Sequence, residues 1–213
     1  MGEVSTTQHN CALAMNSASG LTIHLLGAPT LFFNHLPLNL SRRQPLALLA
    51  YLLLAESAVS RDRLAFLLWP DEAQPVARNR LRMTLFQLRD ILNSVNAGNL
   101  LYSVGDAVMI QHSDCCCDVL NFLQFSQQAQ QLPGSRALAL AEQANQWYRG
   151  EFLEGFVVQN APEFESWMLQ QRQQLERVQR RNLHTLLEAH AEQQNWPQAI
   201  QYGERLAALD PLD

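Results

Sequence analysis

The sequence predicts an α+β domain followed by an all-α region of helical repeats. Short apolar runs broken by Gly, Pro and Asn fill residues 21–40, a pattern typical of a small antiparallel meander. Apolar residues at helical spacing then dominate residues 45–93, and a short hairpin pattern follows at 100–111. From Asp114 onward, almost every segment outside short loops has helical spacing. These three observations give the order of the two parts.

Three helices are expected between the meander and the hairpin. Pro45 fits the first turn of the first helix, which is expected to start at about this residue and run to about Ala55. Ser60 is the expected N-cap of the second helix, Arg61 to Leu68. Pro70 ends that helix, because proline disfavours helical backbone in the residue before it.

The third helix is expected over residues 75–93 and has two kinds of surface. One side is an apolar stripe with members three or four residues apart: Ala77, Leu81, Leu85, Leu88 and Leu92. The other sides carry charged and amide donors: Arg78, Asn79, Arg80, Arg82, Gln87 and Arg89. A hairpin with its turn at Gly105-Asp106 comes next. This order of elements predicts a winged helix, in which the polar helix enters the major groove of DNA and the hairpin is the wing.

The second half is expected to be a stack of helices near residues 119–131, 135–148, 162–193 and 197–209, with its main break at 150–160. Large aromatic residues gather around that break: Trp147, Phe152, Phe156, Phe164 and Trp167. We expect them to be mostly buried, since several exposed aromatic rings would form an apolar surface patch that favours association. The alternative is a partner-binding surface. The sequence stops where another helix would start, so a longer polypeptide is expected.

Charge divides the chain at the same point. The whole chain has a net charge of −5, but residues up to 113 contain eight basic and seven acidic residues, whereas the rest contains seven basic and thirteen acidic ones. Such asymmetry suggests two different tasks. All 15 basic residues are arginine, whose forked guanidinium binds phosphate or guanine bidentately.

Other classes of protein find little support. Cys115, Cys116 and Cys117 are consecutive and lack the spacing of zinc ligands, so small, partly buried side chains are expected instead. No apolar run approaches the roughly 18–20 residues that cross a bilayer. Residues 1–19 have the composition of a disordered tail without the features of a signal peptide, which favours a cytoplasmic protein. No nucleophile, base or metal set converges, so we expect neither an enzyme nor a cofactor.

Several motifs resemble a known family. The stretches 42–52 (RRQPLALLAYL), 59–70 (VSRDRLAFLLWP), 77–82 (ARNRLR) and 85–89 (LFQLR) resemble the OmpR/PhoB-type winged helix of the SARP-like (AfsR-type) transcriptional activators. The stretches 148–155 (YRGEFLEG) and 161–167 (APEFESW) resemble the bacterial transcriptional activator domain that follows it in that family. Residues 183–211 fit one tetratricopeptide-like repeat.

The resemblance implies a winged-helix domain at residues 20–112 and a tetratricopeptide-like activator domain at 114–213. The implied function is sequence-specific DNA binding that regulates transcription, with activation favoured over repression. Implied partners are double-stranded DNA, RNA polymerase, a second copy of the chain and downstream domains of the same polypeptide, with no membrane. Phe86 and Gln87 depart from the family, which often has a small polar residue and an arginine there, and this leaves base preference open.

The DNA-binding residues expected from spacing and from the family pattern lie on the third helix and near the starts of the first two. They are Arg42, Arg43, Arg61, Arg63, Arg78, Asn79, Arg82, Thr84, Phe86, Gln87 and Arg89. The first four are expected mainly to contact phosphates, and the others to line the DNA side of the third helix. The rival hypothesis is a protein-interaction scaffold whose winged helix does not bind DNA, which the acidic total and Gln87 favour.

Overall fold

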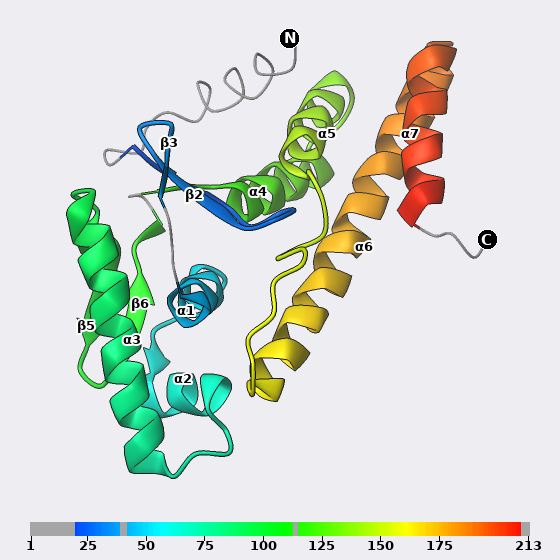
Figure 1. Cartoon of the computed structure of the whole chain (residues 1–213). Helices are drawn as coiled ribbons and strands as arrows, with labels where there is room; N and C mark the ends of the chain where they lie inside the picture. Colours follow the sequence, from blue (N-terminus) through cyan, green and yellow to red (C-terminus); the bar gives the residue numbers. More distant parts are fainter. Residues whose placement is uncertain (1–19, 39–41, 113–114, 210–213) are drawn as a thin grey trace, which may run out of the picture. The chain divides into compact units, whose positions relative to one another are not determined.

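A computed structural model describes residues 20–38, 42–112 and 115–209 of the chain (Figure 1). The residues fall into two compact units. The first contains the described residues up to Leu25, with Pro29–Cys117 and Gly155–Leu169. The second contains Leu26–Ala28, Asp118–Glu154 and the described residues from 170 onward. The expected tail at 1–19 and the expected end of the last repeat at 210–211 lie outside the described residues.

The first unit begins with the expected meander. Strands β1 (Leu21–His24), β2 (Thr30–Phe33) and β3 (Leu36–Leu38) pair antiparallel in sequence order. The predicted turn at residues 34–35 is confirmed, because both residues adopt positive φ, 48° and 69°, as a two-residue hairpin turn requires.

The sequence did not predict the fourth strand of this sheet. Strand β7 (Cys116–Cys117) pairs parallel with β1 and completes the sheet order β3-β2-β1-β7. The three consecutive cysteines are all buried, more completely than the partial burial expected. The winged helix therefore uses residues beyond the end expected for it at 112.

Three helices follow the meander. Helix α1 (Arg43–Leu53) begins two residues before Pro45, so the expected later start is wrong. The physical reason is that the first N–H groups of a helix have no intrahelical partner, and a proline at the third helical position therefore breaks no hydrogen bond. Helices α2 (Arg61–Leu68) and α3 (Gln74–Ser94) lie where the sequence predicts them. The N-cap is confirmed: the Ser60 hydroxyl accepts the Arg63 backbone N–H at 3.2 Å.

The hairpin consists of β5 (Leu101–Val104) and β6 (Ala107–Ile110), joined at Gly105-Asp106 as predicted and preceded by the short 3₁₀ helix η1 (Gly98–Leu100). A two-residue strand, β4 (Val59–Ser60), adds to β6 and gives the sheet order β4-β6-β5. Because β4 ends at the N-cap of α2, this pairing places the hairpin beside the start of that helix.

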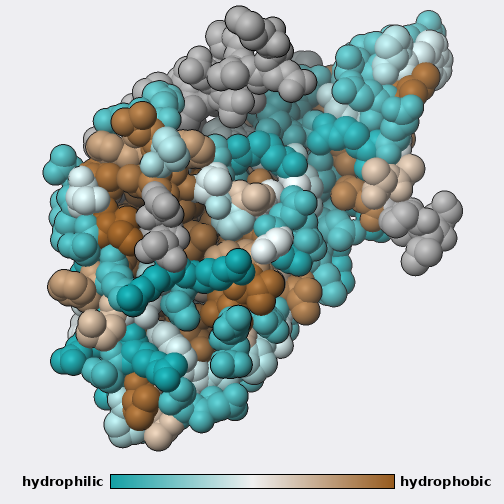
Figure 2. All heavy atoms as spheres, viewed as in Figure 1, coloured by the Kyte–Doolittle hydropathy of each residue, from teal (hydrophilic) through white to brown (hydrophobic). Residues whose placement is uncertain are grey.

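The remaining helices are α4 (Asp118–Gln131), α5 (Ser135–Trp147), α6 (Pro162–Glu192) and α7 (Trp196–Leu209), all within one residue of expectation. The second unit contains these helices except for the start of α6 up to Leu169, which belongs to the first unit. Ala141, Leu183, Leu186 and Tyr202 form a buried core that joins α5, α6 and α7. Figure 1 shows α6 and α7 antiparallel, and in Figure 2 their visible surface is mostly hydrophilic. None of the helices in the described ranges is long and apolar enough to cross a membrane.

A buried carboxylate explains why residues 26–28 group with the second unit. Asp118 is fully buried and accepts the Leu26 backbone N–H at 3.0 Å and an Arg149 guanidinium N–H at 2.7 Å. The backbone of Gly27 is bonded on both sides, to the Glu151 carbonyl at 2.9 Å and to the Glu154 N–H at 3.1 Å. Residues that are far apart in the sequence thus form one polar junction within this unit.

The aromatic residues expected around the 150–160 break divide between the units. Phe152 is buried in the second unit, whereas Phe156 and Phe164 are buried in the first. Trp167 is half-buried and packs against Phe164 and Tyr51, with ring centroids 5.3 and 4.9 Å apart. Trp147 is also half-buried. The expectation of burial is therefore confirmed for the three phenylalanines, whereas the two tryptophans are half-buried.

Candidate nucleic-acid interface

Helix α3 presents three different surfaces. Its core side is buried through Ala77, Leu81, Leu85, Leu88 and Leu92. Arg78, Arg82 and Arg89 follow one flank, since spacings of three, four or seven residues return to the same side of a helix. The side opposite the core is exposed and carries Asn79 and Phe86. The predicted division into a leucine stripe and a polar surface is confirmed.

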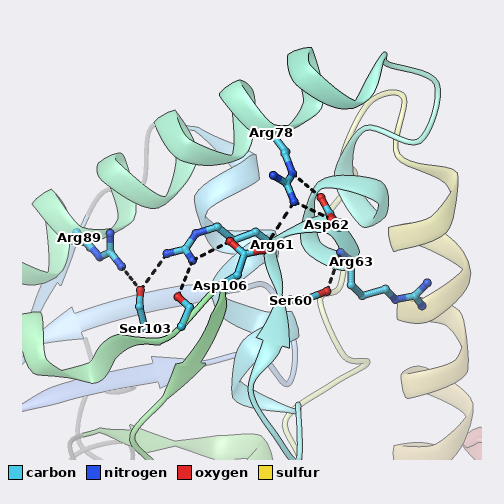
Figure 3. Close-up of polar contacts among 9 residues, drawn as sticks. Ser60, Arg61, Asp62, Arg63, Arg78, Arg89, Ser103 and Asp106 are labelled. Carbon is cyan, nitrogen blue, oxygen red and sulfur yellow. Dashed lines mark hydrogen bonds and ion pairs between the residues drawn. The ribbon is translucent and has the colours of Figure 1, made fainter.

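The flank with the three arginines faces the hairpin. Arg89 donates to the Ser103 hydroxyl at 3.0 Å, and Arg61 from the first turn of α2 donates to the same oxygen at 3.0 Å (Figure 3). Arg61 also bonds the Gly105 carbonyl and the Asp106 carboxylate, and its backbone N–H bonds the Asp106 carbonyl at 3.1 Å. These contacts hold the hairpin beside α3 at its turn.

Arg78 is ion-paired in the free protein. Its guanidinium bonds both carboxylate oxygens of Asp62, and Asp106 lies 3.7 Å away on the hairpin side. The hydrogen bond from Arg78 is the main reason that the pKa of Asp62 is lowered below its usual value of 3.8. The same bond raises the pKa of Arg78. Both side chains are about half exposed, so solvent weakens this pair.

Arg82 and Arg89 differ from Arg78 in the charge of their partners. Arg82 donates to the Asn79 side-chain oxygen at 2.9 Å, and Arg89 to a serine hydroxyl. Among the described residues, neither guanidinium pairs with a carboxylate. The arginine flank borders a hollow of about 210 Å³, lined by Arg61, Arg78, Leu81, Arg82, Leu85 and Arg89. Such a hollow suits an anionic group, because its polar lining is cationic.

The other predicted residues lie in different places. Arg42 shares a second hollow of about 290 Å³ with Phe86 and Gln87. Arg63 is exposed in the first turn of α2. Arg43 donates to the Val157 carbonyl at 2.8 Å and lies over the Phe156 ring, so part of its role is to hold the segment Gly155–Leu169 within the first unit.

The prediction that Thr84 lines the DNA side is wrong. Thr84 is buried, and its hydroxyl donates to the Arg80 carbonyl at 3.0 Å. It lies three residues after Leu81 and four before Leu88, and this spacing places it on the apolar stripe. The sequence pattern therefore already contained the signal against it.

Three residues of the arginine network were not singled out from the sequence: Asp62, Ser103 and Asp106. They lie 16, 14 and 28 residues from their partners on α3, so no local periodicity connects them. Asp62 alone had a usable signal, because an acidic residue in the first turn of a helix beside two arginines marks a charged helix start.

Comparisons with known proteins agree with this architecture. Residues 117–213 match the family described as "Bacterial transcriptional activator domain". A solved structure, Mycobacterium tuberculosis EmbR in complex with a low-affinity phosphopeptide, is similar over 90% of this chain, with a TM-score of 0.70 and 18% identity. The match covers 51% of that chain, so the present chain spans about half its length. No curated protein sequence matches. The chain therefore carries, behind a winged helix, a region that matches the bacterial transcriptional activator domain, and its fold is similar to that of EmbR.

Proposed function

We propose that this protein binds double-stranded DNA sequence-specifically, with α3 in the major groove and the β5–β6 hairpin beside it. One observation carries the proposal. The exposed flank of α3 holds Arg82 and Arg89 without carboxylate partners among the described residues, directly next to a hairpin fixed by Arg61 and Ser103. An α-helix fits the major groove, where arginine can bond the O6 and N7 of guanine bidentately.

The residues divide by role in this proposal. Arg82 and Asn79 lie on the exposed part of α3, and we propose that they contact base edges or phosphates. Arg42 and Arg63 are exposed near the starts of α1 and α2. We propose that they contact phosphates, and such contacts orient a protein on the duplex without reading sequence. Gln87 is half-buried and borders the Arg42 hollow. Thr84 is withdrawn from the interface.

Arg78 can take part only by changing partners. A phosphate that reaches its guanidinium competes with Asp62 and Asp106, whose charges also oppose an approaching anion. This arrangement is the specific observation that favours the rival function, a scaffold whose winged helix does not bind DNA. Arg82 and Arg89 argue against that rival, because their charge is not neutralised in the same way.

We propose that the activator domain binds another protein, either RNA polymerase or a second copy of the chain. Its helices α4 to α7 pack as pairs, and such repeat units are typical of protein-binding scaffolds. In this proposal, the winged helix binds the DNA site and the activator domain binds the partner protein.

Selection of bound sequences from random DNA tests the proposal. We expect the full chain to enrich one sequence motif, and the binding constant for that motif to fall steeply with salt. Replacing Arg63 by Ala should flatten the slope of log affinity against log salt by about one unit if Arg63 contacts a phosphate. No enrichment above random DNA, or binding that is insensitive to salt, would favour the scaffold instead.

A further inference from the structure

The exposed outer face of α3 carries apolar side chains beside Asn79 and Asp90, and the arginine network does not explain them. Phe86 is 64% exposed, Met83 48% and Val76 43%. They are spaced seven and three residues apart, so they lie on the solvent side of the helix, opposite the buried leucine stripe. Figure 2 shows hydrophobic residues set among hydrophilic ones in the lower left of the view, where Figure 1 places α3.

Positive charge borders this apolar face on both sides. Arg78, Arg82 and Arg89 follow one flank, and Arg80 lies on the other, where it pairs with Glu72 at 2.8 Å. Arg42, at the start of α1, borders the same hollow as the Phe86 ring. Asp90 is the one acidic residue within α3; it is exposed four residues after Phe86 and also lines this hollow. An apolar strip between basic flanks complements a groove whose two walls are phosphate backbones and whose floor carries methyl groups.

We infer that Phe86, assisted by Met83, contacts the 5-methyl groups of thymines in the major groove and makes the protein prefer thymine at one or two positions of its site. This inference rests on the proposed function, that α3 enters the major groove. Thymine is the only base that presents a methyl group there, and a phenyl ring is a suitable apolar partner for it. Contact between the methyl group and the exposed ring also removes apolar surface of both from water, which favours binding.

A second copy of the chain is a poorer occupant for this face. Symmetric dimers pair the same patch from both copies. Such pairing would bring the arginine flanks of one α3 against those of the other. Duplex DNA brings phosphate charge to the same flanks and removes the repulsion.

Replacing thymine by deoxyuridine tests the inference, because the two bases differ only by the methyl group. The full chain first selects its preferred duplex from random DNA. Each thymine of that duplex is then replaced singly, and affinity is measured by fluorescence anisotropy. We expect a loss of about fourfold at one or two positions, the size expected for one buried methyl group, and no loss at the others.

Variants assign the effect to the side chain. Phe86→Ala should bind the thymine duplex more weakly and should show no further loss with deoxyuridine, whereas Phe86→Leu should keep part of the discrimination. Ile200→Ala is the matched control, because Ile200 is similarly exposed, at 61%, on α7 of the second unit. It should retain the discrimination of the unmodified chain. Phe86 is exposed, so all three variants should unfold at the same urea concentration.

The outcomes separate this inference from the proposed function. A selected motif whose affinity ignores every deoxyuridine replacement leaves the proposed function standing and overturns the thymine contact. Equal discrimination in the unmodified chain and Phe86→Ala overturns it as well. Loss of a dimer in Phe86→Ala, with an unchanged deoxyuridine profile, assigns the face to a second copy. If no motif is selected at all, both proposals fail together.

Discussion

The arginines of the two units are used in opposite ways. In the second unit, Arg149 neutralises the buried Asp118, and Arg172 donates to the carbonyls of Phe152 and Leu153 at 2.8 and 2.7 Å. In the first unit, Arg82 and Arg89 lie along the surface of α3 and bond neutral side chains. The same residue type therefore stabilises loop backbone in one unit and keeps an available charge in the other.

This difference shows why residue type alone does not identify a binding surface. The chain contains no lysine, so arginine must serve every task that needs a cation. What separates the tasks is exposure and the charge of the partner. A guanidinium bound to a buried carboxylate or to main-chain carbonyls is committed to the fold, whereas one that bonds a hydroxyl or amide at the surface can exchange that partner for phosphate or guanine.

The largest expected effect concerns the structural use of arginine. Replacing Asp118 by Ala removes the buried carboxylate that accepts from Arg149 and from the Leu26 N–H, and should lower the free energy of unfolding by about 3 kcal/mol. Asp118→Asn retains an acceptor for the backbone N–H and should lose less. Urea unfolding followed by circular dichroism measures both variants. Equal stability of Asp118→Ala and the unmodified chain would show that this junction contributes nothing.

A smaller effect is expected where arginine holds the hairpin. Arg61→Ala removes the bonds to the Gly105 carbonyl and to Ser103, and should cost about 1 kcal/mol. Hydrogen exchange of the β5 and β6 amides should become faster. Arg63→Ala is the matched control on the same helix turn, since the Arg63 guanidinium has no bonded partner among the described residues. If hydrogen exchange of these amides is unchanged in Arg61→Ala, Arg61 does not hold the hairpin in place.

The smallest effect concerns the exposed Arg78–Asp62 pair. The pKa of Asp62 is lowered in the folded protein, mainly by the hydrogen bond from Arg78, so its contribution to stability is present above pH 3.8 and is lost as the pH falls and the carboxyl becomes protonated. The stability difference between the unmodified chain and Asp62→Asn should therefore shrink on acidification. If this stability difference stays constant from neutral to acidic pH, the Arg78–Asp62 pair does not stabilise the fold.

Much of the fold was predictable because it is locally encoded. Helices α2 to α7 lie within about one residue of the positions that apolar spacing predicts, since a 3.6-residue period repeats several times in each. Strands β4 and β7 were missed because two residues are too few to show any period, and both depend on partners far away in the sequence. The sequence also did not predict that residues 26–28 belong to the second unit and residues 155–169 to the first, because these assignments too depend on contacts with residues far away in the sequence.

The candidate site was predictable at the level of the helix but not of its contacts. The spacing of the leucines identified the exposed side of α3, but the spacing of Thr84 from Leu81 and Leu88, which places it on the buried stripe, was overlooked. Nothing local connects Asp62 or Asp106 with Arg78. Whether a predicted arginine is free or paired depends on packing between elements, which the residue pattern does not specify.

The comparison between the two units can be tested with two matched arginines. Arg82 on α3 and Arg177 on α6 are both exposed, and each is replaced by Ala in the full chain. Affinity for the selected duplex is then measured by fluorescence anisotropy at fixed salt. Arg82→Ala should weaken binding by about 5-fold to 150-fold, whereas Arg177→Ala should leave it unchanged. Equal affinities for both variants would contradict the assignment of DNA binding to α3.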